Sequence, residues 1–182
     1  MKKALKIFAI IILVIAIGLA ATALYHGMFS NLTVEVKEMG PYKMIYAPHQ
    51  GSYYKVGEVS DKLYTDMVAN GVESDIGIGV YYDDPAKVEE SDLRSEIGIL
   101  VDEKPEDKLI EQYEYKEIAQ AKSAVIEFPI KSTLSYMFAP AKVYPAFVKY
   151  GEENNIEWNE ELGSIEIYDI PAKKIIYIMA VK

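Results

Sequence analysis

The sequence has 182 residues, a formal net charge of −9, a pI near 4.8, two histidines and no cysteine. The acidic balance argues against binding of nucleic acid, whose phosphates need a cationic face, and against docking on anionic lipid headgroups. Without cysteine there is no disulfide framework and no thiolate metal site, and the two histidines, His26 and His49, are far apart in sequence. The sequence has no zinc-helix motif, phosphate loop or dinucleotide glycine fingerprint, so we expect neither a metal centre nor a bound cofactor.

The N-terminus carries a long apolar segment. Residues 7–25 are uncharged and follow Lys2, Lys3 and Lys6, and roughly 20 apolar residues suffice for a helix to cross a bilayer. We therefore predict that residues 1–31 form a transmembrane anchor and a short linker, with a cytoplasmic N-terminus by the positive-inside rule. The alternative is a secreted protein, because Ala21-Thr22-Ala23 has the spacing of a signal-cleavage site. Both readings place the domain outside the cytoplasm.

The next residues to about 102 show one helix between pairs of strands. Residues 33–37 and 42–48 read as strands, and a turn at 50–52 leads to a helix. An apolar stripe at three- and four-residue spacing defines that helix, which Asn70-Gly71 ends; the stripe is Val56, Val59, Leu63 and Met67. Strands are predicted at 76–82 and 95–101.

The pattern repeats after an acidic linker. Residues 115–128 read as one long strand region, a helix is predicted from about 134 to 155, and strands follow at 164–169 and 174–181. Pro145 is expected to kink this helix or to delay its start. Residues 32–182 are thus predicted to be one α+β domain of two strand-helix-strand-strand modules, 32–102 and 114–182. Its antiparallel sheet is covered on one face by two main helices.

Glu166 is the main candidate for chemistry. Strand alternation puts Ile165 and Ile167 on one face, which we expect to meet the helices, and Glu166 and Tyr168 on the opposite, open face. A carboxylate in a partly apolar cleft can recognise a cation or act as an acid or base. The alternative is an ordinary solvated glutamate on an exposed sheet face.

Aromatic residues are abundant, with fifteen tyrosines in the chain. Tyrosine offers an apolar body, a hydroxyl and a face that attracts cations. Gly77 and Gly79 share a strand face with Tyr81, which indicates close approach of a ligand, or else backbone packing or a bulge. The candidates for an aromatic-walled ligand site with Glu166 are Tyr46, Tyr53, Tyr81, Phe138, Trp158 and Tyr168.

Several short motifs together resemble the GyrI-like effector-binding domains, which are built from two strand-helix-strand-strand modules. These motifs are Gly40-Pro41-Tyr42, His49-Gln50-Gly51-Ser52-Tyr53, Val80-Tyr81-Tyr82-Asp83-Asp84-Pro85 and Ile165-Glu166-Ile167-Tyr168. The resemblance runs from about Val34 to Lys182. The N-terminal apolar segment, with Phe128-Pro129, Thr133-Leu134-Ser135 and Val143-Tyr144-Pro145-Ala146, is most similar to the membrane-anchored testis-expressed endoplasmic-reticulum autophagy receptors and their prokaryotic look-alikes.

The resemblance implies a groove that binds drug-like, often cationic molecules. In regulators of this superfamily a buried glutamate and aromatic residues bind the ligand, and Glu166 and Tyr168 match that motif. Gyrase inhibition and hydrolysis, known in other members, do not transfer without their own residues. The receptor's tail function is not expected in a sequence that stops at Lys182, and the receptor's cytosolic domain conflicts with the orientation predicted from the lysines.

We therefore expect a membrane-anchored module that holds a small apolar molecule, expected to be cationic, in an aromatic cleft around Glu166. Its expected partners are the membrane, through residues 7–25, and this hydrophobic or cationic ligand, with a protein as a further option and no nucleic acid. Two alternatives stay open: a membrane-tethered protein-interaction scaffold, and a hydrolase of reactive small molecules in which Glu166 acts on water. The balance favours a protein that is not an enzyme.

Overall fold

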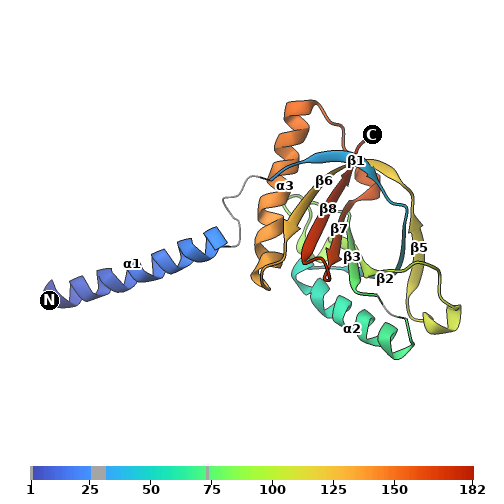
Figure 1. Ribbon diagram of the computed structural model, residues 1–182, viewed down its shortest axis with the longest axis horizontal. Helices are drawn as coiled ribbons and strands as arrows, with labels where there is room; N and C mark the ends of the chain where they lie inside the picture. Colours follow the sequence, from blue (N-terminus) through green and yellow to red (C-terminus); the bar gives the residue numbers. More distant parts are fainter. Residues whose placement is uncertain (1, 26–31, 73) are drawn as a thin grey trace.

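The computed structural model describes residues 2–25, 32–72 and 74–182. The predicted linker after the apolar segment, residues 26–31, lies outside the described residues. The described chain forms one N-terminal helix and a mixed domain, which Figure 1 shows as separate parts.

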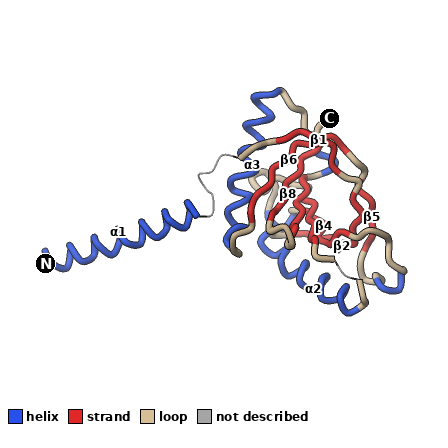
Figure 2. Tube along the Cα trace, viewed as in Figure 1, coloured by secondary structure: helices blue, strands red, loops and turns tan. Residues whose placement is uncertain are grey.

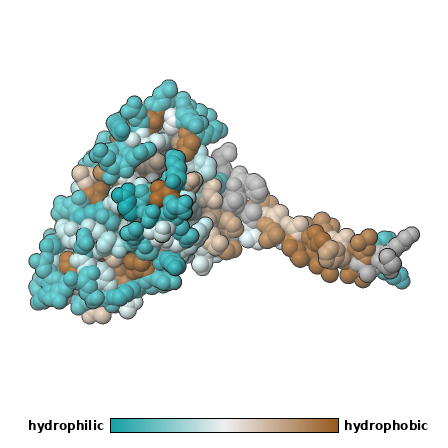
Figure 3. Space-filling model, turned by 180° about the vertical axis from the view of Figure 1, so that it is seen from behind, coloured by the Kyte–Doolittle hydropathy of each residue, from teal (hydrophilic) through white to brown (hydrophobic). Residues whose placement is uncertain are grey.

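The N-terminal helix α1 (Lys2–Tyr25) is apolar and exposed. Within it, Leu5–Thr22 has a mean hydropathy of 2.6 and no share buried against the domain. Twenty-four residues span about 36 Å, enough for a bilayer core of about 30 Å. Figure 3 shows α1 as a largely hydrophobic rod beside a mostly hydrophilic domain. By length and composition this helix can cross a membrane, and a signal sequence has the same properties.

The domain contains two further α-helices and eight strands. The helices are α2 (Val56–Ala69) and α3 (Leu134–Asn154). The strands are β1 (Glu35–Met39), β2 (Tyr42–Gln50), β3 (Ile76–Tyr81), β4 (Arg94–Leu100), β5 (Glu114–Ile118), β6 (Ala121–Pro129), β7 (Ser164–Asp169) and β8 (Lys174–Ala180). Their order matches the predicted strands and helices, except that residues 115–128 were predicted as one strand region.

All eight strands belong to one antiparallel sheet, in the order β1-β6-β8-β7-β3-β4-β2-β5. β3 and β7 pair at its centre and join the two halves. At the edges each half lends its first strand to the other, because β1 pairs with β6 and β5 pairs with β2. The sheet is strongly curled around an interior (Figure 2).

The predicted long strand at 115–128 is two strands, which is a correction. β5 ends at Ile118 and β6 begins at Ala121, because the chain turns a corner there. A matching corner lies between β1 and β2 at Gly40, whose φ is +92°. A Cβ on Gly40 would lie 3.3 Å from Cα of Gln120, so the two corners touch and glycine suits the close approach.

Three apolar clusters fill the domain. One lies on the inner face of the curled sheet and includes Met44, Ile78, Ile165 and Ile167. The other two lie on the outer face, where Leu63 and Met67 of α2 pack near β2 and β4, and Val143 and Phe147 of α3 pack near β6 and β8. The prediction that Ile165 and Ile167 face the helices is therefore wrong. The curled sheet creates a second core on its inner side, and the isoleucines fill it.

Helix α3 begins at Leu134 and contains both Pro140 and Pro145. The helix runs through Pro145, so its start is not delayed. Asn155 ends it in the left-handed conformation, with φ 52°, and asparagine tolerates that conformation better than most residues.

Candidate functional site

A groove runs along the outer face of the sheet between α2 and α3. Its volume is about 2160 Å³, and the central strands β3 and β7 with β4 contribute to its floor. Its aromatic lining comes from several parts of the chain and comprises Tyr53, Tyr54, Tyr64, Tyr81, Tyr82, Tyr136, Tyr144, Trp158 and Tyr168. Ligand pockets usually enclose about 300–1000 Å³, so a small ligand would occupy only part of this groove.

Glu166 lies in the floor of the groove and is 5% exposed. Because its neighbours Ile165 and Ile167 fill the inner core, alternation turns Glu166 outward, to the helix side of the sheet. The prediction that it lies on the face opposite the helices is wrong for the same reason. The result is a carboxylate between two helices instead of one on an open sheet.

Two phenols hold the Glu166 carboxylate. Tyr144 of α3 donates to Oε1 at 2.7 Å, and Tyr168 of β7 donates to Oε2 at 2.6 Å. None of the ion pairs in the described part of the chain includes Glu166. The charge of an ionised Glu166 is therefore spread over neutral donors and is not matched by a cation of the described chain.

Burial raises the pKa of Glu166 above its usual value, and the hydrogen bonds from Tyr168 and Tyr144 oppose that shift in part. Burial, together with the negative charge of Glu166, raises the pKa of Tyr144 and of Tyr168 well above their usual value. Both phenols therefore keep their protons near neutral pH and act as donors. A cation in the groove would favour the ionised carboxylate.

Tyr81 extends this network to the other half of the molecule. Its hydroxyl lies 3.1 Å from that of Tyr168, and its ring lies across Gly79, where an added Cβ would come within 2.7 Å of Cε2 of the ring. Near Gly77 the closest side chain is Tyr168, at 3.5 Å from an added Cβ. The close approach predicted at these two glycines is thus made by tyrosine side chains.

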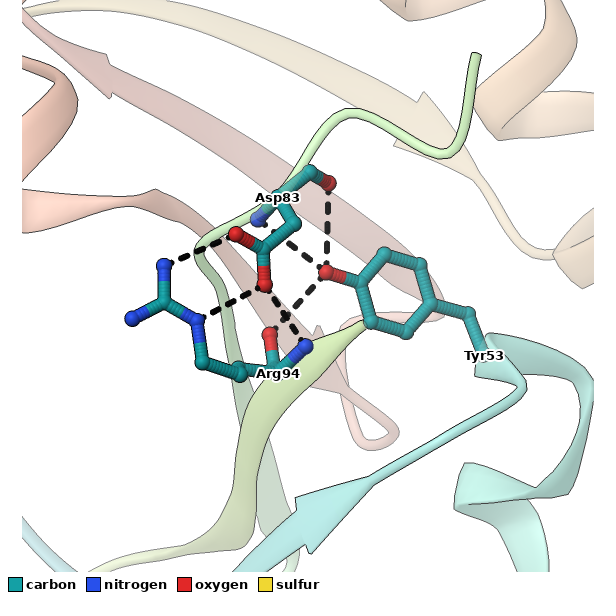
Figure 4. A network of polar contacts seen from close by, with 3 residues as sticks. All are labelled: Tyr53, Asp83 and Arg94. Atoms are coloured by element: carbon teal, nitrogen blue, oxygen red, sulfur yellow. Dashed lines mark hydrogen bonds and ion pairs between the residues drawn. The ribbon is translucent and has the colours of Figure 1, made fainter. Parts of the chain in front are cut away.

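Tyr53 fixes one wall of the groove through a second network, shown in Figure 4. Its hydroxyl lies 3.1 Å from the backbone oxygen of Asp83 and 3.0 Å from that of Arg94, and it accepts the Asp83 amide at 3.2 Å. The Arg94 guanidinium binds the Asp83 carboxylate at 2.8 and 3.0 Å. The Tyr53 ring meets Tyr81 edge-on at 5.0 Å. Tyr53 therefore ties the start of α2 to the β3–β4 connection.

The other predicted site residues lie in different places. Trp158 borders one end of the groove and packs edge-on against Phe147 at 6.1 Å. Phe138 is half-buried on α3 and is not one of the described residues that line the groove. At about 100° per residue it lies roughly 120° around the helix from Tyr144, which explains its separate position.

Tyr46 lies on the inner face of the sheet and not in the groove. It belongs to the inner core, and its hydroxyl donates to Glu114 at 2.8 Å. Beside it, Lys116 pairs with Glu96 and lies 5.2 Å from the centre of the Tyr46 ring. This inner cluster joins β2, β4 and β5 at one edge of the sheet.

Sequence reasoning missed two tyrosines near Glu166. Tyr144 was not selected because helix periodicity alone does not say which side of α3 meets the groove. Tyr177 pairs with Glu166 across β7 and β8, is 1% exposed, and has no hydrogen-bond partner for its hydroxyl among the described residues. Strand alternation with the correct pairing would have identified Tyr177. No cluster of three or more potential metal ligands occurs among the described residues.

The fold matches bacterial domains of known structure. It is similar to the integron cassette protein VCH_CASS2 of Vibrio cholerae, with a TM-score of 0.59 at 11% identity over 84% of this chain and 100% of that one. It is similar to the C-terminal domain of EcmrR, with a TM-score of 0.59 at 12% identity over 83% and 98%. It is also similar to SAV2435, solved bound to tetraphenylphosphonium, with a TM-score of 0.56 at 12% identity over 82% and 94%. No curated protein sequence matches significantly.

The curled antiparallel sheet with helices is thus a fold that this chain shares with bacterial domains of known structure. The sequence itself identifies the family: residues 32–174 match the GyrI-like small molecule binding domain. The chain belongs to this family, in agreement with the resemblance seen in its motifs.

Proposed function

We propose that the groove between α2 and α3 binds a small apolar cation, with Glu166 as its counter-ion and the tyrosines as its walls. The observation that carries this proposal is the environment of Glu166: a buried carboxylate that receives two phenol hydrogen bonds and takes part in no ion pair of the described chain. A buried charge is costly unless it is paired. A cation would supply the missing charge.

The walls of the groove suit the same ligand. Tyrosine faces attract cations, and the attraction strengthens where water is excluded. The tyrosine floor offers flat apolar area for aromatic or aliphatic groups on the cation. The likeness in fold to SAV2435, which was solved with tetraphenylphosphonium, supports a lipophilic cation as the ligand class and supplies a probe.

We propose further that α1 is retained and holds the domain at a membrane, with the N-terminus cytoplasmic and the groove on the other side. Its apolar length and the lysines before it support this. Among GyrI-like proteins the membrane-anchored autophagy-receptor type also has an N-terminal apolar segment, but its domain faces the cytosol. Fractionation with an N-terminal mass measurement tests it, since a cleaved signal would release a shortened, soluble chain.

Titration of the groove with two probes of similar size tests the counter-ion role. Tetraphenylphosphonium carries a charge and triphenylphosphine oxide does not. Glu166→Gln keeps the size and should weaken phosphonium binding at least about tenfold, which is about 1.4 kcal/mol, with little change for the neutral probe. Glu152→Gln is the matched control, because this carboxylate borders the groove in an exposed position. Equal losses for both probes would contradict the proposal.

The affinity should also depend on pH in a defined direction. A cation binds the ionised carboxylate, so phosphonium affinity should fall as the pH drops through the raised pKa of Glu166, and binding below that pKa should release a proton. Calorimetry in buffers of different ionisation enthalpy measures this release. The Glu166→Gln variant should show no such release.

A hydrolase is the second candidate, favoured by one observation. Tyr144 and Tyr168 give Glu166 acid partners within hydrogen-bond reach, which a glutamate acting on water would need. Cation binding ranks first because each oxygen of the Glu166 carboxylate already accepts a hydrogen bond from a tyrosine hydroxyl. An open groove also suits a small ligand better than the scaffold function. Turnover of an electrophile that depends on Glu166 and rises with pH would reverse this ranking.

A further inference from the structure

One edge of the domain combines exposed apolar side chains with lysines. It is formed by the segment before α3, the start of α3 and the β7–β8 turn. The segment is joined to the turn by a hydrogen bond of 2.8 Å from the Ile130 amide to the Lys173 oxygen. Leu134, Met137 and Ile170 are 39%, 67% and 51% exposed there. We call this surface the α3 edge and define it as Lys131, Leu134, Met137, Ile170 and Lys173.

The charges of the α3 edge differ in sign from the whole chain. Lys131 and Lys173 are exposed on it, whereas the net charge of the sequence is −9. Lys174 pairs with Glu127 at 3.0 Å, and Asp169, whose carboxylate accepts the Ala172 amide at 2.9 Å, offsets one of the two lysine charges, so the edge stays net positive. The general argument against anionic headgroups therefore does not apply to this edge.

The end of α1 contacts the α3 edge. The Lys131 Nζ donates to the backbone oxygen of Tyr25 at 2.6 Å and lies 5.1 Å from the centre of the Tyr25 ring. A lysine at a helix C-terminus is favourable because it meets the unpaired carbonyls. Seven residue steps separate Tyr25 from Leu32, so this connection reaches at most about 25 Å. A membrane that holds α1 is consequently close to this edge of the domain.

We propose that the α3 edge rests on the lipid surface that holds α1, with Leu134, Met137 and Ile170 among the headgroups and with Lys131 and Lys173 on lipid phosphates. This rests on the proposed retention of α1 and extends it to the groove, because Tyr136, Met137 and Ile170 also line the groove. The mouth of the groove then opens at the boundary of lipid and water. Lipophilic cations concentrate at that boundary, and the groove would take its ligand from there.

The absence of cysteine permits a clean test with single-cysteine variants of the full chain. Met137→Cys and Ile170→Cys, each labelled with an environment-sensitive fluorophore, report on the edge. Val68→Cys is the matched control, because Val68 is a 46% exposed apolar residue on α2 that does not border the groove. The proteins are placed in vesicles of phosphatidylcholine and phosphatidylglycerol. Emission at 137 and 170 should shift to the blue and be quenched several-fold more by doxyl lipids than emission at 68.

Equal quenching at all three positions would overturn the proposal. Protection from aqueous iodide at 137 and 170 without quenching by doxyl lipids would also overturn it, because a protein would then cover the edge. Lys131→Glu with Lys173→Glu should reduce the quenching in vesicles that contain phosphatidylglycerol, and an unchanged signal would overturn the role of the lysines. If the chain did not float with the vesicles in a density gradient, both the membrane anchor and this proposal would be wrong. Phosphonium titration measures ligand binding in the groove separately.

Discussion

The two modules differ where they meet, at the centre of the sheet. The strand order reads the same from either end when the modules are exchanged, so residues 77–81 of β3 have counterparts at 164–168 in β7. The β1–β2 corner of one module is equivalent to the β5–β6 corner of the other. When residues are matched from these corners through the strand pairings, Gly79 corresponds to Glu166 and Tyr81 corresponds to Tyr168. Gly79 and Glu166 are also direct partners across the seam. Equivalent positions thus hold a glycine in one module and the carboxylate in the other.

This difference shows how two similar modules produce one site. Two glutamates at these positions would face each other as adjacent cross-strand partners, and like charges there are unfavourable. Glycine removes the second charge and leaves room for the Tyr81 ring. The two equivalent tyrosines then meet through their hydroxyls, so the second module's carboxylate is supported by both modules.

Restoring the missing carboxylate should have the largest effect. Gly79→Glu would displace Tyr81 and place a second buried acid beside Glu166, so we expect a loss of at least about 3 kcal/mol in unfolding free energy at pH 7. Acidification should recover part of the loss, because protonation removes the repulsion. Urea unfolding at pH 7 and pH 5 measures both effects. Gly57→Glu is the control, since nothing lies within 4 Å of a Cβ at that exposed helix position.

Removing the hydroxyl shared by both halves should come next. Tyr168→Phe deletes a donor to Glu166 and the contact with Tyr81, so we expect a loss of about 2 kcal/mol. The pKa of Glu166 should rise further, because one of the two hydrogen bonds that lower it is gone. Carboxyl carbon NMR of labelled protein follows that titration. A pKa that falls or stays constant would contradict the assigned donor.

The unfolding free energy should depend on pH because one module carries the buried Glu166, whereas the other has the uncharged Gly79 at the equivalent position. The folded state binds the Glu166 proton more tightly than the unfolded chain, where the reference pKa is 4.5. The contribution of Glu166 to stability is therefore greatest below that pH and falls as the pH rises towards the raised folded-state pKa, by about 1.4 kcal/mol per unit of pKa difference. Glu166→Gln should abolish this decline. Denaturant unfolding of the wild-type chain and of the Glu166→Gln variant between pH 4 and pH 8 measures this difference.

The smallest effect is expected for the tyrosine of the glycine module. Tyr81→Phe removes one hydroxyl contact and keeps the ring over Gly79, so the loss should be about 0.5–1 kcal/mol. Phosphonium binding should change less than for Tyr168→Phe, which touches Glu166 directly. Parallel unfolding and titration experiments rank the two variants. A larger effect at Tyr81 would show that the first module contributes more to the site than its geometry implies.

The sequence predicts the element order and the α+β class, because apolar periodicity and turn residues are local signals. It does not reveal the curl of the sheet. The isoleucines beside Glu166 were expected to meet the helices, since a single-layer picture contains one core. The curled sheet has an inner core as well, and which face meets which core depends on pairing between strands far apart in sequence.

The candidate site was predictable only in part, because strand alternation is a local signal but the packing of elements far apart in sequence is not. Tyr81 and Tyr168 share the strand motifs with Glu166, and alternation groups them correctly. Tyr46 also sits on a strand, but its face belongs to the inner core. Tyr144 comes from a helix, and its place beside Glu166 depends on how α3 crosses the sheet. The orientation of a helix against distant strands is not encoded in its own periodicity.

The exchange of first strands between the modules limits how this protein can be divided. A fragment that ends before residue 114 would keep β1 but lose β6, and it would keep β2 but lose β5. It would also keep β3 but lose β7, so backbone groups along three strands would lack partners, and such edges promote aggregation. The two modules therefore complete each other's sheets, and we expect neither half to fold on its own.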